Sequence, residues 1–106
     1  GNLMPTESQV YAWTTQLVTA LTENYGLQGY TGKAPTFSIT VGKKYYKVIG
    51  DQGGVNAFVE KKTGHVYKPA SWARPAQHVR YDLSDTMSRE SCYHRANFTG
   101  GYLYIR

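Results

Sequence analysis

Two pairs of adjacent lysines are the residues whose type and spacing point most directly to chemistry. Lys43-Lys44 and Lys61-Lys62 each fall in a predicted β-turn. In a meander of antiparallel strands these turns lie at the same end of the sheet, about two strand spacings or roughly 10 Å apart. Four ammonium groups along one edge would attract a polyanion with salt-sensitive, sequence-independent affinity. The residues that would extend this edge are Arg74 and Arg80.

Aromatic side chains beside these lysines make the prediction more specific. Tyr45 and Tyr67 lie near the basic edge of the predicted sheet. Basic side chains combined with aromatic rings for stacking are typical of proteins that bind single-stranded nucleic acid. The alternative is that lysines at hairpin turns are only solvated and keep sheet edges from aggregating. Residue types alone leave both interpretations open.

Metal-ligand and phosphate-loop patterns are weak in this sequence. Cys92-x-His94 supplies two ligands where a structural zinc site needs four, and His65 and His78 lie apart from them. The segment 50–54 is rich in glycine but lacks the Lys-Ser/Thr of a phosphate loop, and it predicts a turn. We therefore expect no metal and no cofactor.

Catalytic residues are equally hard to identify. Ser71, His78 and Asp82 have the residue types of a nucleophile, a base and its orienting acid. No nucleophile-elbow sequence surrounds the serine, and a triad is recognised by geometry rather than by residue type. We therefore predict that the protein is not an enzyme and has no catalytic residue.

The net charge of +5 is concentrated in the middle of the 106-residue chain. Eight basic and two acidic residues give residues 43–80 a charge of +6, whereas residues 1–42 sum to −1 and residues 81–106 to zero. A chain of this length has room for a single domain, residues 1–106. With a single cysteine and no long apolar run, we expect no membrane association and a cytoplasmic location.

The N-terminal segment predicts an amphipathic helix from about residue 6 to residue 24. Thr6 and Gln9 have the spacing of a capping box, and Gly26 is placed to end the helix in a left-handed conformation. Apolar residues recur at helical spacing and form one stripe. These residues are Val10, Trp13, Leu17, Ala20 and Leu21.

Four strands are predicted to follow, over residues 36–41, 44–49, 55–61 and 65–68. A two-residue turn at Gly42-Lys43 would place Ile39 opposite Tyr46 in the first hairpin. A three-residue loop over residues 62–64, with Gly64 in the left-handed conformation, would join the third and fourth strands. The fold class is therefore α+β, with one N-terminal amphipathic helix packed on a small antiparallel meander sheet.

The C-terminal half is expected to be irregular. Prolines interrupt residues 69–75, where we expect Trp72 to be a buried anchor, with an exposed interface anchor as the alternative. A short second helix over residues 85–95 would begin at Asp85 or Ser84. The residues 102–105 predict a terminal strand.

The segment Lys62-Thr63-Gly64-His65-Val66-Tyr67-Lys68-Pro69-Ala70-Ser71-Trp72-Ala73-Arg74-Pro75-Ala76 resembles small tailed-phage proteins, common in marine phage and metagenomic sequences. They share the pattern K-T-G-x-V-Y-K-P-A-S-W-x-x-P-A, and the ending Gly100-Gly101-Tyr102-Leu103-Tyr104 is similar too. The resemblance covers about the last half of the chain. It implies a viral protein made in a bacterial host cytoplasm, and it assigns no functional residue.

Two functional hypotheses follow from these observations. The first is a non-enzymatic binding module for an anionic partner such as nucleic acid, which uses the basic residues named above. The second is a structural or host-interaction protein whose tyrosine-rich outer face, drawn from ten tyrosines, contacts a protein partner or a second copy of the chain. Binding that depends on salt favours the first hypothesis, and binding insensitive to salt favours the second.

Overall fold

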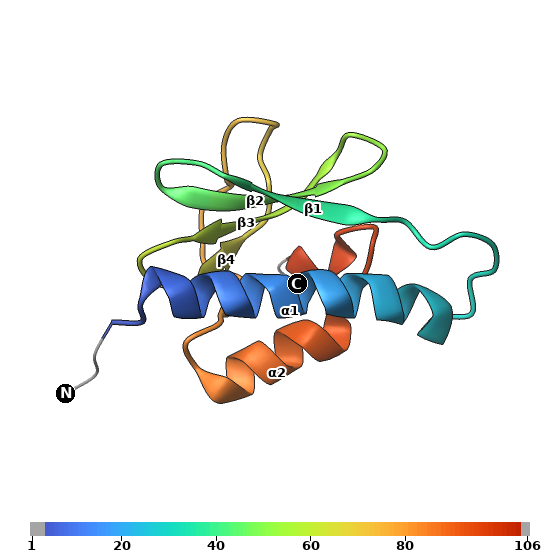
Figure 1. The fold of residues 1–106 in the computed structure, drawn as a ribbon, viewed down its shortest axis with the longest axis horizontal. Helices are drawn as coiled ribbons and strands as arrows, with labels where there is room; N and C mark the ends of the chain where they lie inside the picture. The colour runs from blue at the N-terminus through green and yellow to red at the C-terminus, as the bar shows by residue number, and fades with distance from the viewer. Residues whose placement is uncertain (1–3, 105–106) are drawn as a thin grey trace.

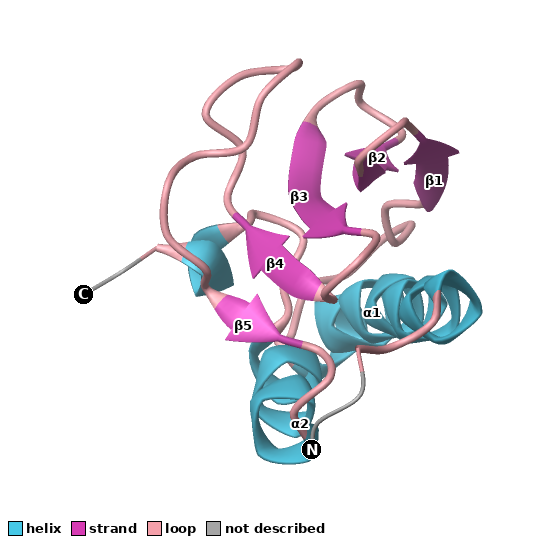
Figure 2. Ribbon diagram, turned by 90° about the vertical axis from the view of Figure 1, so that its left-hand side faces the viewer, coloured by secondary structure: helices cyan, strands magenta, loops and turns pink. Residues whose placement is uncertain are grey.

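Two helices cover one side of a five-stranded antiparallel sheet in the computed structural model, which describes residues 4–104 (Figures 1 and 2). The strands follow one another in space as they do in sequence, in the order β1-β2-β3-β4-β5. This arrangement confirms the predicted α+β class. The elements are α1 (Glu7–Leu27), β1 (Phe37–Val41), β2 (Tyr45–Gly50), β3 (Val55–Glu60), β4 (His65–Tyr67), β5 (Tyr81–Asp82), α2 (Thr86–Arg95) and the 3-10 turn η1 (Gly101–Leu103).

Helix α1 begins where its capping residues predict. The Thr6 side chain accepts a hydrogen bond from the backbone N–H of Gln9, and the Gln9 side chain accepts one from the backbone N–H of Thr6. Four residues one or two turns apart are buried against the sheet: Val10, Thr14, Leu17 and Leu21. The buried Thr14 hydroxyl donates to the carbonyl of Val10 at 2.8 Å, which satisfies its polar atom inside the core.

The end of α1 differs from the prediction. The helix includes Gly26 and continues to Leu27, with Gln28 as its C-terminal cap. The left-handed conformation expected at Gly26 occurs at Gly29, which has φ +86°. The stop therefore lies three residues later, because a glycine with helical φ and ψ can stay inside a helix at modest cost.

The first hairpin has a longer turn than predicted. Val41 pairs with Tyr46 and Ile39 pairs with Val48, so the predicted pairing of Ile39 with Tyr46 is wrong by two residues. The backbone N–H of Gly42 donates to the carbonyl of Tyr45 at 2.9 Å and closes the wider turn. A shift of two residues leaves every side chain on its predicted face, since strand side chains alternate with a period of two.

Strand β5 is an element that the sequence pattern did not predict. Its two residues pair with β4, so that His65 lies opposite Asp82 and Val66 opposite Tyr81. Gly64 takes the predicted left-handed conformation, with φ +81°, and its carbonyl accepts from the N–H of Leu83 at 2.9 Å. A strand this short carries no periodicity, so only its tertiary pairing defines it.

The core lies between the inner face of the sheet and the two helices. Val48 and Val59 meet Leu17 and Leu21 of α1 there. The C-terminal segment completes this core with Leu83 and Cys92, which are fully buried. Asp85 caps α2 as predicted, because its side chain accepts from the N–H of Ser88 at 3.0 Å.

The predicted terminal strand is wrong over its described residues. Gly101–Leu103 forms a 3-10 turn, which Gly100 enters at φ +80°, and Leu103 is fully buried. The Tyr102 hydroxyl donates to Oδ1 of Asn56 at 2.6 Å, which fixes the turn beneath the sheet. Ile105, the last residue of that predicted strand, lies outside the described residues.

Neither helix within residues 4–104 is long and apolar enough to cross a membrane.

Candidate anion-binding surface

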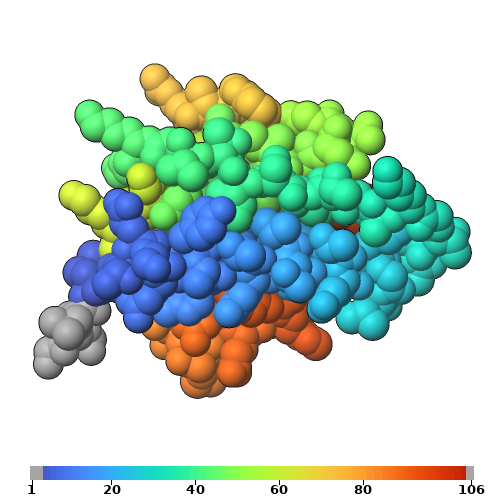
Figure 3. All heavy atoms as spheres, in the orientation of Figure 1, coloured from blue at the N-terminus to red at the C-terminus, as the bar shows by residue number. Residues whose placement is uncertain are grey.

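The two lysine-bearing turns lie side by side at one end of the sheet. The β1–β2 turn and the β3–β4 turn both project at the end where α1 begins (Figure 1). They are directly hydrogen-bonded, because the N–H of Lys61 donates to the carbonyl of Lys44 at 3.0 Å. In the space-filling view, green atoms of the first turn and yellow atoms of the second extend beyond the body of the protein (Figure 3). We call Lys43, Lys44, Lys61 and Lys62 the basic rim.

Lys61 does not contribute an exposed ammonium group to this rim. Its side chain is only 14% exposed, and Nζ lies 3.9 Å from Oε1 of Glu7. The same atom donates to the carbonyl of Gly42 at 3.1 Å and lies over the ring of Tyr46. Position 61 continues the alternation of β3, so its side chain turns toward α1. The expectation that four ammonium groups line the edge is therefore wrong for this residue.

The other three lysines of the rim face solvent. Lys43 and Lys62 are exposed, and within residues 4–104 no carboxylate lies within 4.0 Å of either ammonium group. Lys44 is 66% exposed and its Nζ lies 3.8 Å from Oε2 of Glu60, a contact weakened by solvent screening. The rim thus presents two unpaired ammonium groups and one partly neutralised one.

The outer face of the sheet, which points away from α1, carries an aromatic cluster next to the rim. The Tyr45 ring packs edge-on against the rings of Phe58 and Tyr67, with centroid distances of 5.7 and 6.2 Å. Nζ of Lys47 lies 5.5 Å from the centre of the Phe58 ring, which is nearly buried. Burial raises the pKa of Tyr67, and the nearby Glu60 carboxylate raises it further.

Trp72 lies over this outer face and is exposed, so the prediction that it is buried is wrong. Its side chain remains 56% accessible, and Nζ of Lys47 lies 4.3 Å from its ring. The surrounding loop is closed by its own backbone, through the bridge between Pro69 and Pro75 and the hydrogen bond from Ala70 N–H to the Arg74 carbonyl. This loop holds itself together by backbone pairing, so it needs no buried anchor.

The two arginines proposed to extend the basic edge have different environments. Arg74 is exposed in the loop that carries Trp72. Arg80 donates instead to three backbone carbonyls, those of Gln77 at 2.7 Å, His78 at 2.6 Å and Leu103. These bonds hold His78 in a left-handed conformation with φ 75°. Arg80 therefore has a structural task away from the rim.

The candidate catalytic and metal-binding residues make contacts that do not correspond to a catalytic triad or a metal site. Asp82 lies 3.8 Å from Nε2 of His65 and accepts from the Ser84 hydroxyl at 2.6 Å, so its partners are not those of the suggested triad. Burial raises the pKa of the Cys92 thiol to about 12, which makes it a poor nucleophile. No group of three or more metal-ligating side chains is found among the residues that the structure describes.

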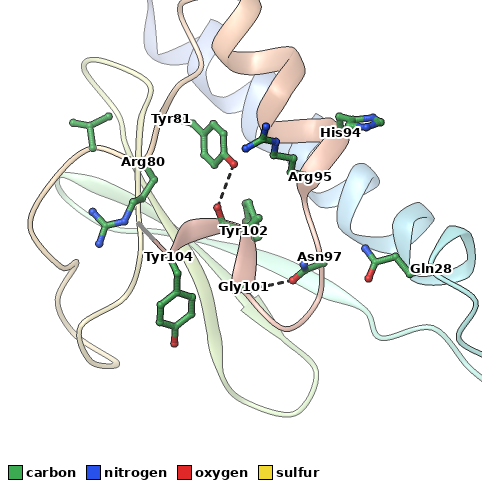
Figure 4. Close-up of a pocket in the computed structure, with 10 residues that line it drawn as sticks. Gln28, Arg80, Tyr81, His94, Arg95, Asn97, Gly101, Tyr102 and Tyr104 are labelled. Atoms are coloured by element: carbon green, nitrogen blue, oxygen red, sulfur yellow. Dashed lines mark hydrogen bonds between the residues drawn. The ribbon is translucent and has the colours of Figure 1, made fainter. Parts of the chain in front are cut away.

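A pocket that sequence analysis missed lies between the end of α2, the approach to β5 and η1 (Figure 4). Its volume is about 1030 Å³. The Tyr81 hydroxyl donates to the carbonyl of Tyr102 at 3.2 Å across the base. Burial raises the pKa of Tyr81, and the Arg95 guanidinium beside it opposes that rise. The pair His94-Arg95 was the available sequence signal, but nothing local links it to residues 79–81.

Comparison with known proteins gives a family but no activity. No curated protein and no solved structure matches the chain. The family's description names no source, so the phage origin remains a prediction. Residues 3–105 match the model of a family of unknown function, DUF7717, and the chain therefore belongs to this family.

Proposed function

We propose that this domain is a non-enzymatic binding module for single-stranded nucleic acid. The strand would run from the basic rim along the outer face of the sheet to Trp72. The observation that carries the proposal is an exposed tryptophan on the same outer face as Lys47, in a sheet whose one end carries the two unpaired ammonium groups of the rim. Lysines would hold phosphates, and the indole ring would stack on a base.

The charge distribution favours a single strand over a duplex. Helix α1 carries Glu7 and Glu23 and no basic residue, so it has no cationic face to enter a major groove. An exposed aromatic ring can stack only on a base that has left the helical stack. The outer face offers this contact at Trp72, beside a lysine that can reach the neighbouring phosphate.

The alternative of a protein partner on a tyrosine-rich outer face has less support. Tyr45 and Tyr67 are half-buried against Phe58 and offer little free apolar area. The exposed tyrosines are Tyr11 on α1, Tyr30 after that helix and Tyr104 near the C-terminus, so they do not gather on one face. A hot spot for protein binding needs such anchors together.

The proposal extends to the setting in which the protein acts. We place it in the cytoplasm of a bacterial host, as a phage protein. The resemblance of residues 62–76 to tailed-phage proteins supports this origin. A buried free thiol at Cys92 suits a reducing compartment.

Fluorescence anisotropy with a labelled oligothymidylate tests the proposal. We expect binding at low salt that weakens as salt rises. Replacing both unpaired rim lysines, in the variant Lys43→Gln/Lys62→Gln, should weaken binding about tenfold at physiological salt, because two phosphate contacts are lost. The control is Lys33→Gln, which removes one exposed charge from the loop after α1 at the opposite end of the molecule (Figure 1) and should bind as the unmodified protein does.

Two results would overturn the proposal. One is no binding above background at low salt by the unmodified protein. The other is a loss of binding free energy in Lys33→Gln about half as large as that in the rim variant, because a loss that follows the number of charges removed would reflect net charge rather than a defined surface. Competition by unlabelled duplex should be weaker than competition by unlabelled single strand.

A further inference from the structure

The pocket near the C-terminus has a composition unlike the rest of the surface. It is bordered by residues from four segments of the chain, and Gln28 places it at the end of α1 opposite to the basic rim. A volume of about 1030 Å³ is enough for a small organic molecule. The lining residues are Gln28, Val79, Arg80, Tyr81, His94, Arg95, Asn97, Gly101, Tyr102 and Tyr104.

The lining is basic and contains no carboxylate. Arg80, His94 and Arg95 are the ionisable nitrogen bases, and no Asp or Glu borders the pocket. Within residues 4–104, no carboxylate oxygen lies within 4.0 Å of the Arg95 guanidinium. Figure 4 shows this guanidinium near the ring of Tyr81. An arginine that has no carboxylate partner among these residues and lies at the wall of a concave site is suited to an anion.

Neutral side-chain amides also border the pocket. Oδ1 of Asn97 accepts from the Thr99 hydroxyl at 2.6 Å and from the N–H of Gly101 at 3.2 Å. These two donors identify which atom of the amide is the oxygen, so its NH2 group is a hydrogen-bond donor. Gln28 supplies a second side-chain amide at the edge of the pocket.

The walls of the pocket are held in place by internal hydrogen bonds. Nδ2 of Asn24 donates to the carbonyls of Tyr93 and Ala96 at 3.0 and 2.8 Å, which anchors the end of α2 to α1. Arg80 joins the opposite wall to Leu103, as described above. A site on rigid walls loses little entropy on binding, which raises the affinity available from few contacts.

From this geometry we propose that the pocket binds a phosphate monoester carried on a small organic group. The Arg95 guanidinium would contact two phosphate oxygens, since its planar fork matches that geometry. The side-chain amide of Asn97, which also borders the pocket, would donate to another polar group of the ligand. The space is larger than a free phosphate ion needs, and Val79 and Tyr104 offer apolar surface for the organic part. This site is separate from the proposed nucleic-acid surface and does not depend on it.

Isothermal titration calorimetry with adenosine 5′-monophosphate tests the proposal, with inorganic phosphate and adenosine as the comparison ligands. The monophosphate should bind at least about tenfold more tightly than either part alone. Arg95→Gln should weaken its binding about tenfold or more, because a charge-assisted pair of hydrogen bonds is lost. The affinity of Arg95→Lys for the monophosphate should lie between those of the unmodified protein and Arg95→Gln, since lysine keeps the charge but lacks the planar fork of the guanidinium.

Controls separate this site from the basic rim and identify the source of the phosphate. Arg74→Gln removes an exposed arginine outside the pocket and should bind the monophosphate normally. Lys43→Gln/Lys62→Gln should do the same, whatever its effect on oligonucleotides. Short oligothymidylates with a 5′-phosphate or a 5′-hydroxyl distinguish a strand terminus from a free metabolite. If the pocket binds the terminus of a strand, the 5′-phosphorylated oligomer should bind more tightly than the 5′-hydroxyl oligomer, and this difference should disappear in Arg95→Gln.

The proposal is overturned if neither the monophosphate nor the 5′-phosphorylated oligomer binds, or if Arg95→Gln binds them as the unmodified protein does. Equal affinities for the monophosphate and inorganic phosphate would also contradict it. Amide chemical shifts of the folded Arg95→Gln protein confirm that a loss of binding is not a loss of structure.

Discussion

Neighbouring lysines with opposite orientations give the sharpest prediction. Lys61 and Lys62 are adjacent and carry the same charge, but only Lys62 is exposed. The substitutions Lys61→Gln and Lys62→Gln therefore make the same change in net charge. If the rim acts through direct phosphate contacts, Lys62→Gln should affect binding and Lys61→Gln should affect folding.

The expected magnitudes follow from the contacts of each side chain. Loss of one phosphate contact lowers the slope of log affinity against log salt by about 0.7 for a single strand. Lys62→Gln should show this change, with a free energy of unfolding altered by less than about 0.5 kcal/mol. Lys61→Gln removes the charged hydrogen bond to the Gly42 carbonyl and the contact with the Tyr46 ring. These losses should cost about 1–2 kcal/mol of stability.

Two assays separate the variants. Fluorescence anisotropy of a labelled oligothymidylate over a series of salt concentrations gives the slope, and urea denaturation gives the free energy of unfolding. We expect a reduced slope with normal stability for Lys62→Gln, and a normal slope with reduced stability for Lys61→Gln. Equal changes in slope for both variants would refute the reasoning, because affinity would then follow total charge and not orientation.

Three further predictions concern other parts of the structure. Trp72→Ala should weaken oligothymidylate binding about 5- to 100-fold in anisotropy without changing the salt slope, since stacking is lost and charge is kept; a changed slope would contradict this. Asn24→Ala should lower the free energy of unfolding by about 2 kcal/mol in urea, because two helix-end carbonyls lose their donor, whereas Thr22→Ala on the exposed side of α1 should change it little. Folding raises the pKa of the Cys92 thiol from 9.0 to about 12. The protonated thiol therefore contributes fully to the free energy of unfolding below pH 9, and this contribution is lost as pH rises toward about 12. In thermal melts over a series of pH values, Cys92→Ala should show a smaller loss of melting temperature between pH 9 and about 12. An unchanged pH dependence would show that the thiol does not contribute.

Local signals predicted the parts of the fold that depend on neighbouring residues. The capping box at Thr6 and Gln9, the left-handed Gly64 and the Asp85 cap all form as their spacing indicates. The turn after Val41 was two residues too short in the prediction, because residue types at Gly42-Lys43 suit more than one turn length. The predicted face of each strand side chain is still correct, because the register differs by an even number of residues.

The features that sequence reasoning missed depend on contacts between distant segments. Strand β5 exists only by pairing with β4, and the exposure of Trp72 follows from how its loop pairs with itself. Topology predicted that the two lysine turns share one end of the sheet. It did not predict that Lys61 turns inward to Glu7, because that contact needs the position of α1. The pocket likewise combines Gln28, Tyr81 and Arg95, which no motif connects.

Amide chemical-shift mapping during titration with an unlabelled oligothymidylate tests the central proposal most directly. We predict shifts concentrated at the two lysine turns, along β2 on the outer face and in the loop around Trp72, together with a shift of the Trp72 indole N–H. The indole N–H of Trp13, on α1 at the other side of the sheet, should stay unchanged. Shifts confined to the helices, or no shifts at low salt, would contradict the proposed surface.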